Sequence, residues 1–250
     1  MANDLHDEGT NRTGIARHPL AGPQAESASS DAAPAGGGDG AYAAAMRAPR
    51  LEQRVALGSM PPPASVIGAL KAGTQVAAGR HPNVLLDKLG ERLAFERAGA
   101  RLYELALHAT QVLGEVPGGP RVEELRALRD AEARHAALVG QAIVDLGGDP
   151  TCLTPSGDAI GTAGAGLLQV LADPRTSRSQ RLCALLAAEL TDHDGWELLV
   201  DLTRASGHAE LAKRFEDAMH EEARHVLQVR GWLRGHTMAS LQTHRAGVDT

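Results

Sequence analysis

The chain shows helical periodicity from Val84 to about residue 234, with apolar residues recurring at three- and four-residue steps. Short runs that contain Gly or Pro interrupt this pattern at 114–120, 147–150 and 205–208. Residues of these types commonly end helices. The pattern therefore predicts four long helices, over about 84–114, 121–146, 177–205 and 208–234.

The lengths of the connections predict how these helices are arranged. Short connections join the first pair and the second pair, so each pair is expected to form a helical hairpin. The connection from 148 to 176 is long, and its stretch GTAGAGLLQVLAD predicts a short helix of its own. A connection of this length allows the chain to cross back along the bundle. The predicted fold is an all-α four-helix bundle of two hairpins joined by a long crossover.

Residues 1 to about 80 differ in composition from the rest of the chain. They are rich in Ala, Gly, Ser and Pro, and Tyr42 is their only aromatic residue. Such a segment buries too little apolar area to offset the entropy lost on ordering, so we expect a mostly disordered tail, with 65–73 as a candidate short helix. A docking or targeting role is the functional alternative. The predicted organisation is a low-complexity segment over 1–80, a bundle over 81–236 and a flexible C-terminal tail over 237–250.

Each predicted helix carries ionisable residues among its apolar positions. They are Glu96 in the first helix, Glu132 and His135 in the second, Glu189 and Asp192 in the third, and Glu222 and His225 in the fourth. A buried carboxylate without a partner is costly, so several carboxylates at one level of a core need compensating positive charge. Divalent cations supply that charge, and iron and manganese accept carboxylate and imidazole ligands.

The spacing in the second and fourth helices supports a site for two metals. Glu132-Ala-Arg-His135 and Glu222-Ala-Arg-His225 are each Glu-x-x-His, and residues i and i+3 of a helix share a face. Di-iron and di-manganese bundles take one Glu from each of two helices and Glu-x-x-His from each of the other two. The sequence fills all six places. We expect the glutamates of the two motifs to bridge the metals and each histidine to cap one.

At these residues the chain resembles the ferritin-like superfamily, specifically its bacterioferritin and rubrerythrin branches, over about 84–147 and 177–234. In those families a tyrosine commonly lies seven residues after the glutamate ligand of the first helix, as Tyr103 follows Glu96 here. The step from Glu189 to Glu222 is also similar to the second half of the family pattern. The resemblance implies a four-helix bundle with two iron ions in its core.

Three departures from those families refine the expectation. Ala133 stands where bacterioferritins have their haem-binding methionine, so haem is not expected. The two cysteines, Cys152 and Cys183, form no CxxC pair and cannot build a rubredoxin-type iron site, so a separate electron donor is expected. Asp192 stands where rubrerythrins have an additional glutamate ligand, and its shorter side chain is either a metal ligand or an acceptor that supports one.

The resemblance implies a redox enzyme in which a di-ferrous centre reacts with dioxygen or hydrogen peroxide, as a rubrerythrin-like oxidase or peroxidase or as a ferroxidase. In this interpretation Glu96 and Glu189 are terminal ligands, and Tyr103 supplies an electron or a hydrogen bond. Two alternatives stay open. In the first, the bundle is not catalytic, metal only stabilises its fold, and it acts as a stress or interaction protein. In the second, a manganese pair disproportionates peroxide, as in a catalase.

Charge and composition limit the expected partners. The sum of 25 basic against 31 acidic residues gives −6, which offers no general attraction to nucleic acid or to an anionic membrane. The N-terminal residues lack the apolar core of a secretory signal, and no later stretch reaches the roughly 18 apolar residues of a membrane span, so we expect a cytoplasmic protein. The long tail and the crossover favour a homodimer or a larger homo-oligomer.

Overall fold

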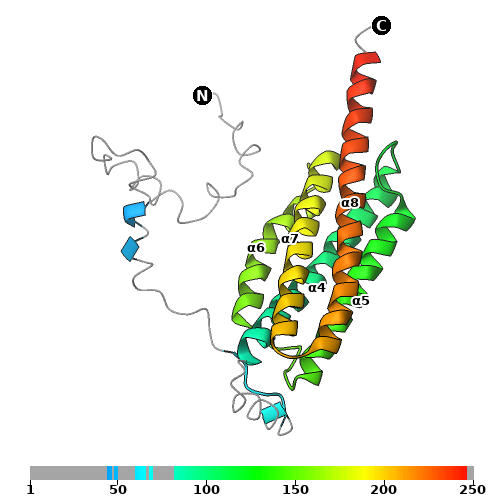
Figure 1. Cartoon of the computed structure of the whole chain (residues 1–250). Coiled ribbons are helices and arrows are strands. Elements are labelled where there is room, and N and C mark those ends of the chain that lie inside the picture. Colours follow the sequence, from blue (N-terminus) through cyan, green and yellow to red (C-terminus); the bar gives the residue numbers. More distant parts are fainter. Residues whose placement is uncertain (1–43, 47, 50–59, 66–67, 70–81, 247–250) are drawn as a thin grey trace. The chain divides into compact units, whose positions relative to one another are not determined.

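The computed structural model describes residues 44–46, 48–49, 60–65, 68–69 and 82–246. The chain divides into two units, Met1–Val55 and Ala56–Thr250, and residues 44–46 and 48–49 of the first are helical. The second unit contains five long helices, which Figure 1 labels α4 (Pro82–Leu113), α5 (Val122–Asp145), α6 (Pro155–Ala172), α7 (Arg178–Ala205) and α8 (Ala209–Ala246). The described part of the chain contains no strand, so the all-helical class is confirmed.

Glycine residues end three of these helices close to the predicted positions. Gly114, Gly147 and Gly207 follow α4, α5 and α7 with φ values of 79°, 90° and 83°. This left-handed backbone is readily adopted only by glycine. At the start of α7, Ser177 accepts a hydrogen bond from the Gln180 amide and Gln180 accepts one from the Ser177 amide. This reciprocal cap fixes where α7 begins.

Helices adjacent in sequence pack side by side, α4 with α5 and α7 with α8 (Figure 1). The predicted helix in the long connection is α6, which packs on α4 and α7. Its first turn is fixed to α4, because the Ser156 amide and hydroxyl donate to the Asp87 carboxylate at 2.9 and 2.6 Å. Thr154 caps the same turn by accepting a hydrogen bond from the Gly157 amide at 3.1 Å.

Two apolar clusters fill the core, one toward each end of the bundle. Along α5 and α7 the chain passes first through the cluster that contains Leu125 and Leu185 and then through the cluster that contains Val139 and Leu199. Along α4 and α8 it meets the two clusters in the opposite order. Helices α5 and α7 therefore run in the same direction, and the connection through α6 returns the chain along the bundle.

The last helix is longer than its sequence pattern predicts. The pattern places its end near residue 234, whereas α8 continues to Ala246, so residues 237–246 are helical instead of belonging to a flexible tail. Gly235 lies inside α8 and does not end it. It lies where the backbone of α8 passes close to the backbone at Gly118. A Cβ atom at Gly235 would lie 2.8 Å from the carbonyl oxygen of Gly118.

Part of the segment predicted as a disordered tail packs on the bundle. The Ala64 amide donates to the carbonyl oxygen of Gly147 at 3.1 Å. Ser65 caps a helical turn, since its hydroxyl accepts from the Gly68 amide at 3.0 Å and its carbonyl from the Ala69 amide at 2.8 Å. Of the candidate helix over 65–73 only residues 65, 68 and 69 are described, of which 68–69 are helical, and most of segment 1–80 lies outside the described residues. No described helix is long and apolar enough to cross a membrane.

Candidate metal centre

The ionisable residues predicted from the apolar positions lie together in the layer between the two apolar clusters. Each is at most 5% exposed, and each of the four long bundle helices contributes at least one. They are Glu96 from α4, Glu132 and His135 from α5, Glu189 and Asp192 from α7, and Glu222 and His225 from α8. The structure therefore brings together all seven residues that the sequence nominates as metal ligands, and their binding of metal stays a prediction.

The first group of ligand atoms surrounds His225. One ligand atom from each of Glu132, Glu189, Glu222 and His225 lies within 4.8 Å of the others. The Nδ1 atom of His225 is 3.0 Å from Oε2 of Glu222 and 3.8 Å from a carboxylate oxygen of both Glu132 and Glu189. Three carboxylates and one imidazole thus converge at a single position.

The second group surrounds His135. Its Nδ1 atom lies 2.6 Å from Oε1 of Glu222 and 3.7 Å from Oε2 of Glu96. Glu222 belongs to both groups, because its two oxygens face different histidines. Glu132 also lies within reach of Glu96 and Glu222 in a third grouping that includes Asp192. The cluster therefore contains two neighbouring groups of ligand atoms that could each hold a metal ion, and Glu222 belongs to both.

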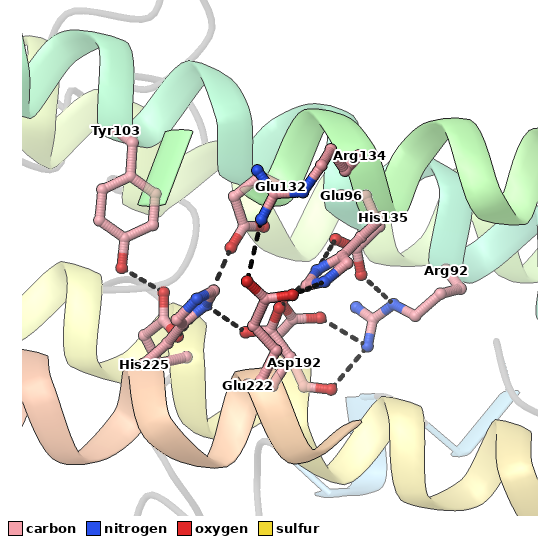
Figure 2. Close-up of polar contacts among 11 residues, drawn as sticks. Arg92, Glu96, Tyr103, Glu132, Arg134, His135, Asp192, Glu222 and His225 are labelled. Carbon is pink, nitrogen blue, oxygen red and sulfur yellow. Dashed lines mark hydrogen bonds and ion pairs between the residues drawn. The ribbon is translucent and has the colours of Figure 1, made fainter. Parts of the chain in front are cut away.

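Tyr103 lies at the end of the cluster near His225, and Arg92 lies at the opposite end near His135 (Figure 2). The Tyr103 side chain is 1% exposed, and its hydroxyl donates a hydrogen bond to Oε1 of Glu189. Burial and the negative charge of Glu189 raise the pKa of Tyr103 well above its usual value. Tyr103 is therefore held in its protonated form beside one of the candidate ligands.

Two residues of the site were missed by the sequence reasoning. Arg92 is buried one turn before Glu96, and its guanidinium forms ion pairs with Glu96 and with Asp192. Its position four residues before Glu96 was the available signal, because such residues share a helix face. Glu221 is half-buried, and its carboxylate lies 3.1 Å from Nε2 of His135. As a surface glutamate next to a motif residue it gave no sequence signal.

Glycine residues make room for two of the charged side chains. A Cβ atom at Gly99 of α4 would lie 2.2 Å from Oε2 of Glu132, and one at Gly195 of α7 would lie 2.2 Å from Nη1 of Arg92. Real Cβ contacts do not occur at such distances. Gly99 therefore leaves room for the Glu132 carboxylate of α5 directly against α4.

Burial dominates the electrostatics of the centre. It raises the pKa of Glu96, Glu132 and Glu189 well above the usual range, and neighbouring carboxylates raise it further. Burial also raises the pKa of Asp192, and the charge of Arg92 limits the rise to about 6. At Glu222 the nearby imidazoles of His135 and His225 outweigh burial and lower the pKa to about 2. Without added positive charge, burial and mutual repulsion favour the protonated form of these carboxyls.

Buried polar atoms that lack a hydrogen bond indicate whether the site suits a metal. Buried atoms without a hydrogen-bond partner include both oxygens of Glu96, one oxygen each of Glu132, Glu189 and Glu222, and Nδ1 of His135. Buried polar atoms in proteins are normally hydrogen-bonded, so such a concentration needs an explanation. Every one of these atoms can donate a lone pair to a cation, and the set fits divalent iron or manganese.

Comparisons with known proteins return no match: no family model, curated protein or solved structure is similar to this chain. The described part of the chain is a helical bundle that contains a buried cluster of acids and histidines that could hold a metal ion.

Proposed function

We propose that this chain is a ferritin-like di-metal carboxylate protein that holds two iron ions and uses them in a redox reaction with dioxygen or hydrogen peroxide. The observation that carries the proposal is the position of Glu222, whose two oxygens face the two histidines of the two ligand groups. A carboxylate with one oxygen toward each of two positions is suited to bridge two metals. Manganese accepts the same ligands and is the alternative metal.

The order of the helices supports the ferritin-like part of the proposal. The ligands come from α4, α5, α7 and α8 in the order Glu, Glu-x-x-His, Glu, Glu-x-x-His. The chain returns along the bundle between α5 and α7, as the two-hairpin arrangement with a crossover requires. One metal would be held by the group around His225 and the other by the group around His135.

A pair of ferrous ions, when bound, supplies the electrons that reduce the oxidant. The protein contributes a donor set held in place before the metals arrive. Glu221 can accept a hydrogen bond from a protonated Nε2 of His135, which leaves Nδ1 of that ring as the ligand atom. Tyr103 donates to one oxygen of Glu189 and leaves the other oxygen directed toward His225. The apolar clusters on either side exclude bulk water from the reacting groups.

The proposal is tested by loading metal-free protein with ferrous iron under anaerobic conditions and then adding oxygen or hydrogen peroxide. We expect two ions per chain and a spectral change on oxidation that is complete before free ferrous iron reacts. The test variant is Glu222→Ala, and the matched control is Glu197→Ala on the exposed face of α7. The control should behave as wild type, and the test variant should lose at least one ion.

The same experiment separates the proposal from a bundle in which metal has only a structural role. A structural site is saturated by protein ligands, whereas a catalytic site keeps an open position. Binding of two ions without any change on adding oxidant would support the structural alternative. Retention of two ions by a Glu132→Ala, Glu222→Ala double variant would refute the site itself.

A further inference from the structure

The centre contains one carboxylate more than a di-metal bundle of this type requires. Its five fully buried acidic side chains are Glu96, Glu132, Glu189, Asp192 and Glu222, whereas the expected constellation has four glutamates. Two divalent ions carry four positive charges, so five carboxylates with neutral histidines would leave one negative charge in the core. A buried charge without compensation is strongly unfavourable.

Arg92 is the one Lys or Arg side chain that is buried in the described part of the chain. Its Nη1 atom lies 2.8 Å from Oδ1 of Asp192 and donates a hydrogen bond to the backbone oxygen of the same residue at 2.7 Å. Its Nε atom lies 3.1 Å from Oε1 of Glu96. The guanidinium also contacts the face of Phe95 at 4.6 Å, and Gly195 leaves the space that it fills.

Asp192 adds no third metal position to the centre. The ligand grouping that contains it consists otherwise of Glu96, Glu132 and Glu222, and each of these already belongs to a group with a histidine. One Asp192 oxygen and the backbone oxygen of the same residue are engaged by Arg92. Asp192 is thus the carboxylate of the cluster with the closest fixed cation.

We propose that Arg92 is a built-in third cation of the centre, which pairs with Asp192, keeps that carboxylate out of the metal coordination and sets the charge of the site for two divalent ions. The inference rests on the proposed function. Five carboxylates and one guanidinium give −4, which two divalent ions neutralise. Arg92 is in this sense a positioning residue, because it acts on the metals through Asp192 and Glu96.

The charge count gives opposite expectations for single and double variants. In Asp192→Asn the loaded centre carries +1, and Arg92 interacts with Glu96 alone, so the second metal ion should bind at least about tenfold more weakly. In an Arg92→Met, Asp192→Asn double variant the loaded centre is neutral again. Its affinity for the second ion should return to within about threefold of wild type. If Asp192 were a ligand, the double variant would remain as weak as the single one.

The probe is Co²⁺, titrated into the metal-free full-length chain, because its absorption bands report coordination number and it does not oxidise under these conditions. Wild type, Asp192→Asn and the double variant are compared, with Asp194→Asn as the control. Asp194 is exposed on the same helix, so this control removes an equal charge at the surface. We expect the control to match wild type in stoichiometry, affinity and spectrum.

The Co²⁺ absorption spectrum at saturation shows whether Asp192 is a ligand, even where the double variant does not fold. We expect Asp192→Asn, once saturated with Co²⁺, to show the wild-type spectrum, because no ligand has been removed. An altered spectrum at saturation, or a double variant that binds no better than Asp192→Asn, would overturn the inference. Failure of wild type itself to bind two Co²⁺ ions would instead count against the proposed function.

Discussion

Replacing one of the buried acids by an apolar side chain should affect the stability of the metal-free protein in a predictable way, and Glu189 is the clearest case. Its side chain is 1% exposed, and burial and the charge of Glu222 raise its pKa well above the usual range. Replacing a buried ion pair by apolar side chains of similar volume is often neutral or stabilising by about 1–4 kcal/mol, and replacing a crowded buried carboxyl removes the same kind of desolvation cost. Met has a suitable volume, so Glu189→Met should remove metal binding without an equal loss of stability.

The Tyr103 hydroxyl modifies this expectation, because it donates its hydrogen bond to Glu189. Glu189→Met leaves that buried hydroxyl without an acceptor, which costs about 1–3 kcal/mol. The gain and the cost are of similar size, so the single variant should unfold within about 2 kcal/mol of the metal-free wild type. A Glu189→Met, Tyr103→Phe double variant removes both polar partners and should be about 1–3 kcal/mol more stable than the single variant.

Urea unfolding of the metal-free chain, followed by circular dichroism in the presence of a chelator at pH 7, measures these differences. The control is Glu197→Met on the exposed face of the same helix, which should change the free energy of unfolding by less than about 0.5 kcal/mol. A double variant less stable than the single one would refute the reasoning. It would mean that the Tyr103 hydroxyl makes a stabilising contact besides its hydrogen bond to Glu189.

Three further outcomes follow from the site. Burial raises the pKa of three glutamates in the metal-free protein, which therefore keeps protons that the unfolded chain releases above about pH 4.5; its melting temperature should fall as the pH rises above that value, and metal should abolish the fall. Gly99→Ala should displace the Glu132 carboxylate and lower the iron content per chain, whereas Gly161→Ala, where nothing lies within 4 Å, should leave iron content unchanged and raise the melting temperature slightly. Glu221→Gln should weaken metal binding roughly tenfold in equilibrium titrations, because Glu221 orients His135.

Residues with a local signature could be predicted from the sequence. Helical periodicity predicted the long helices. Gly114, Gly147 and Gly207 indicated where three of them end, because glycine readily adopts the left-handed backbone that often follows a helix. The ligand candidates could be predicted because each of the four predicted long helices carries a charged residue among its apolar positions. One such residue is unusual, and its recurrence on four helices indicates a shared site. The convergence of those candidates in one layer is what the structure adds.

Features that depend on contacts between distant segments were not predictable. Gly235 appeared to be a helix end, and only the approach of Gly118 explains why α8 continues past it. The burial of Arg92 was not predicted, because it depends on Asp192 and on the space left by Gly195 of another helix. Such tertiary effects have no signal in the periodicity of a single helix.

The proposed function requires two metal ions in the layer between the apolar clusters. Diffraction from iron-loaded crystals on both sides of the iron absorption edge would locate bound iron. We expect two anomalous peaks, one next to Nδ1 of His225 and one next to Nδ1 of His135, with the Glu222 carboxylate between them. A single peak, or peaks outside this layer at full iron loading, would show that the centre does not hold two irons.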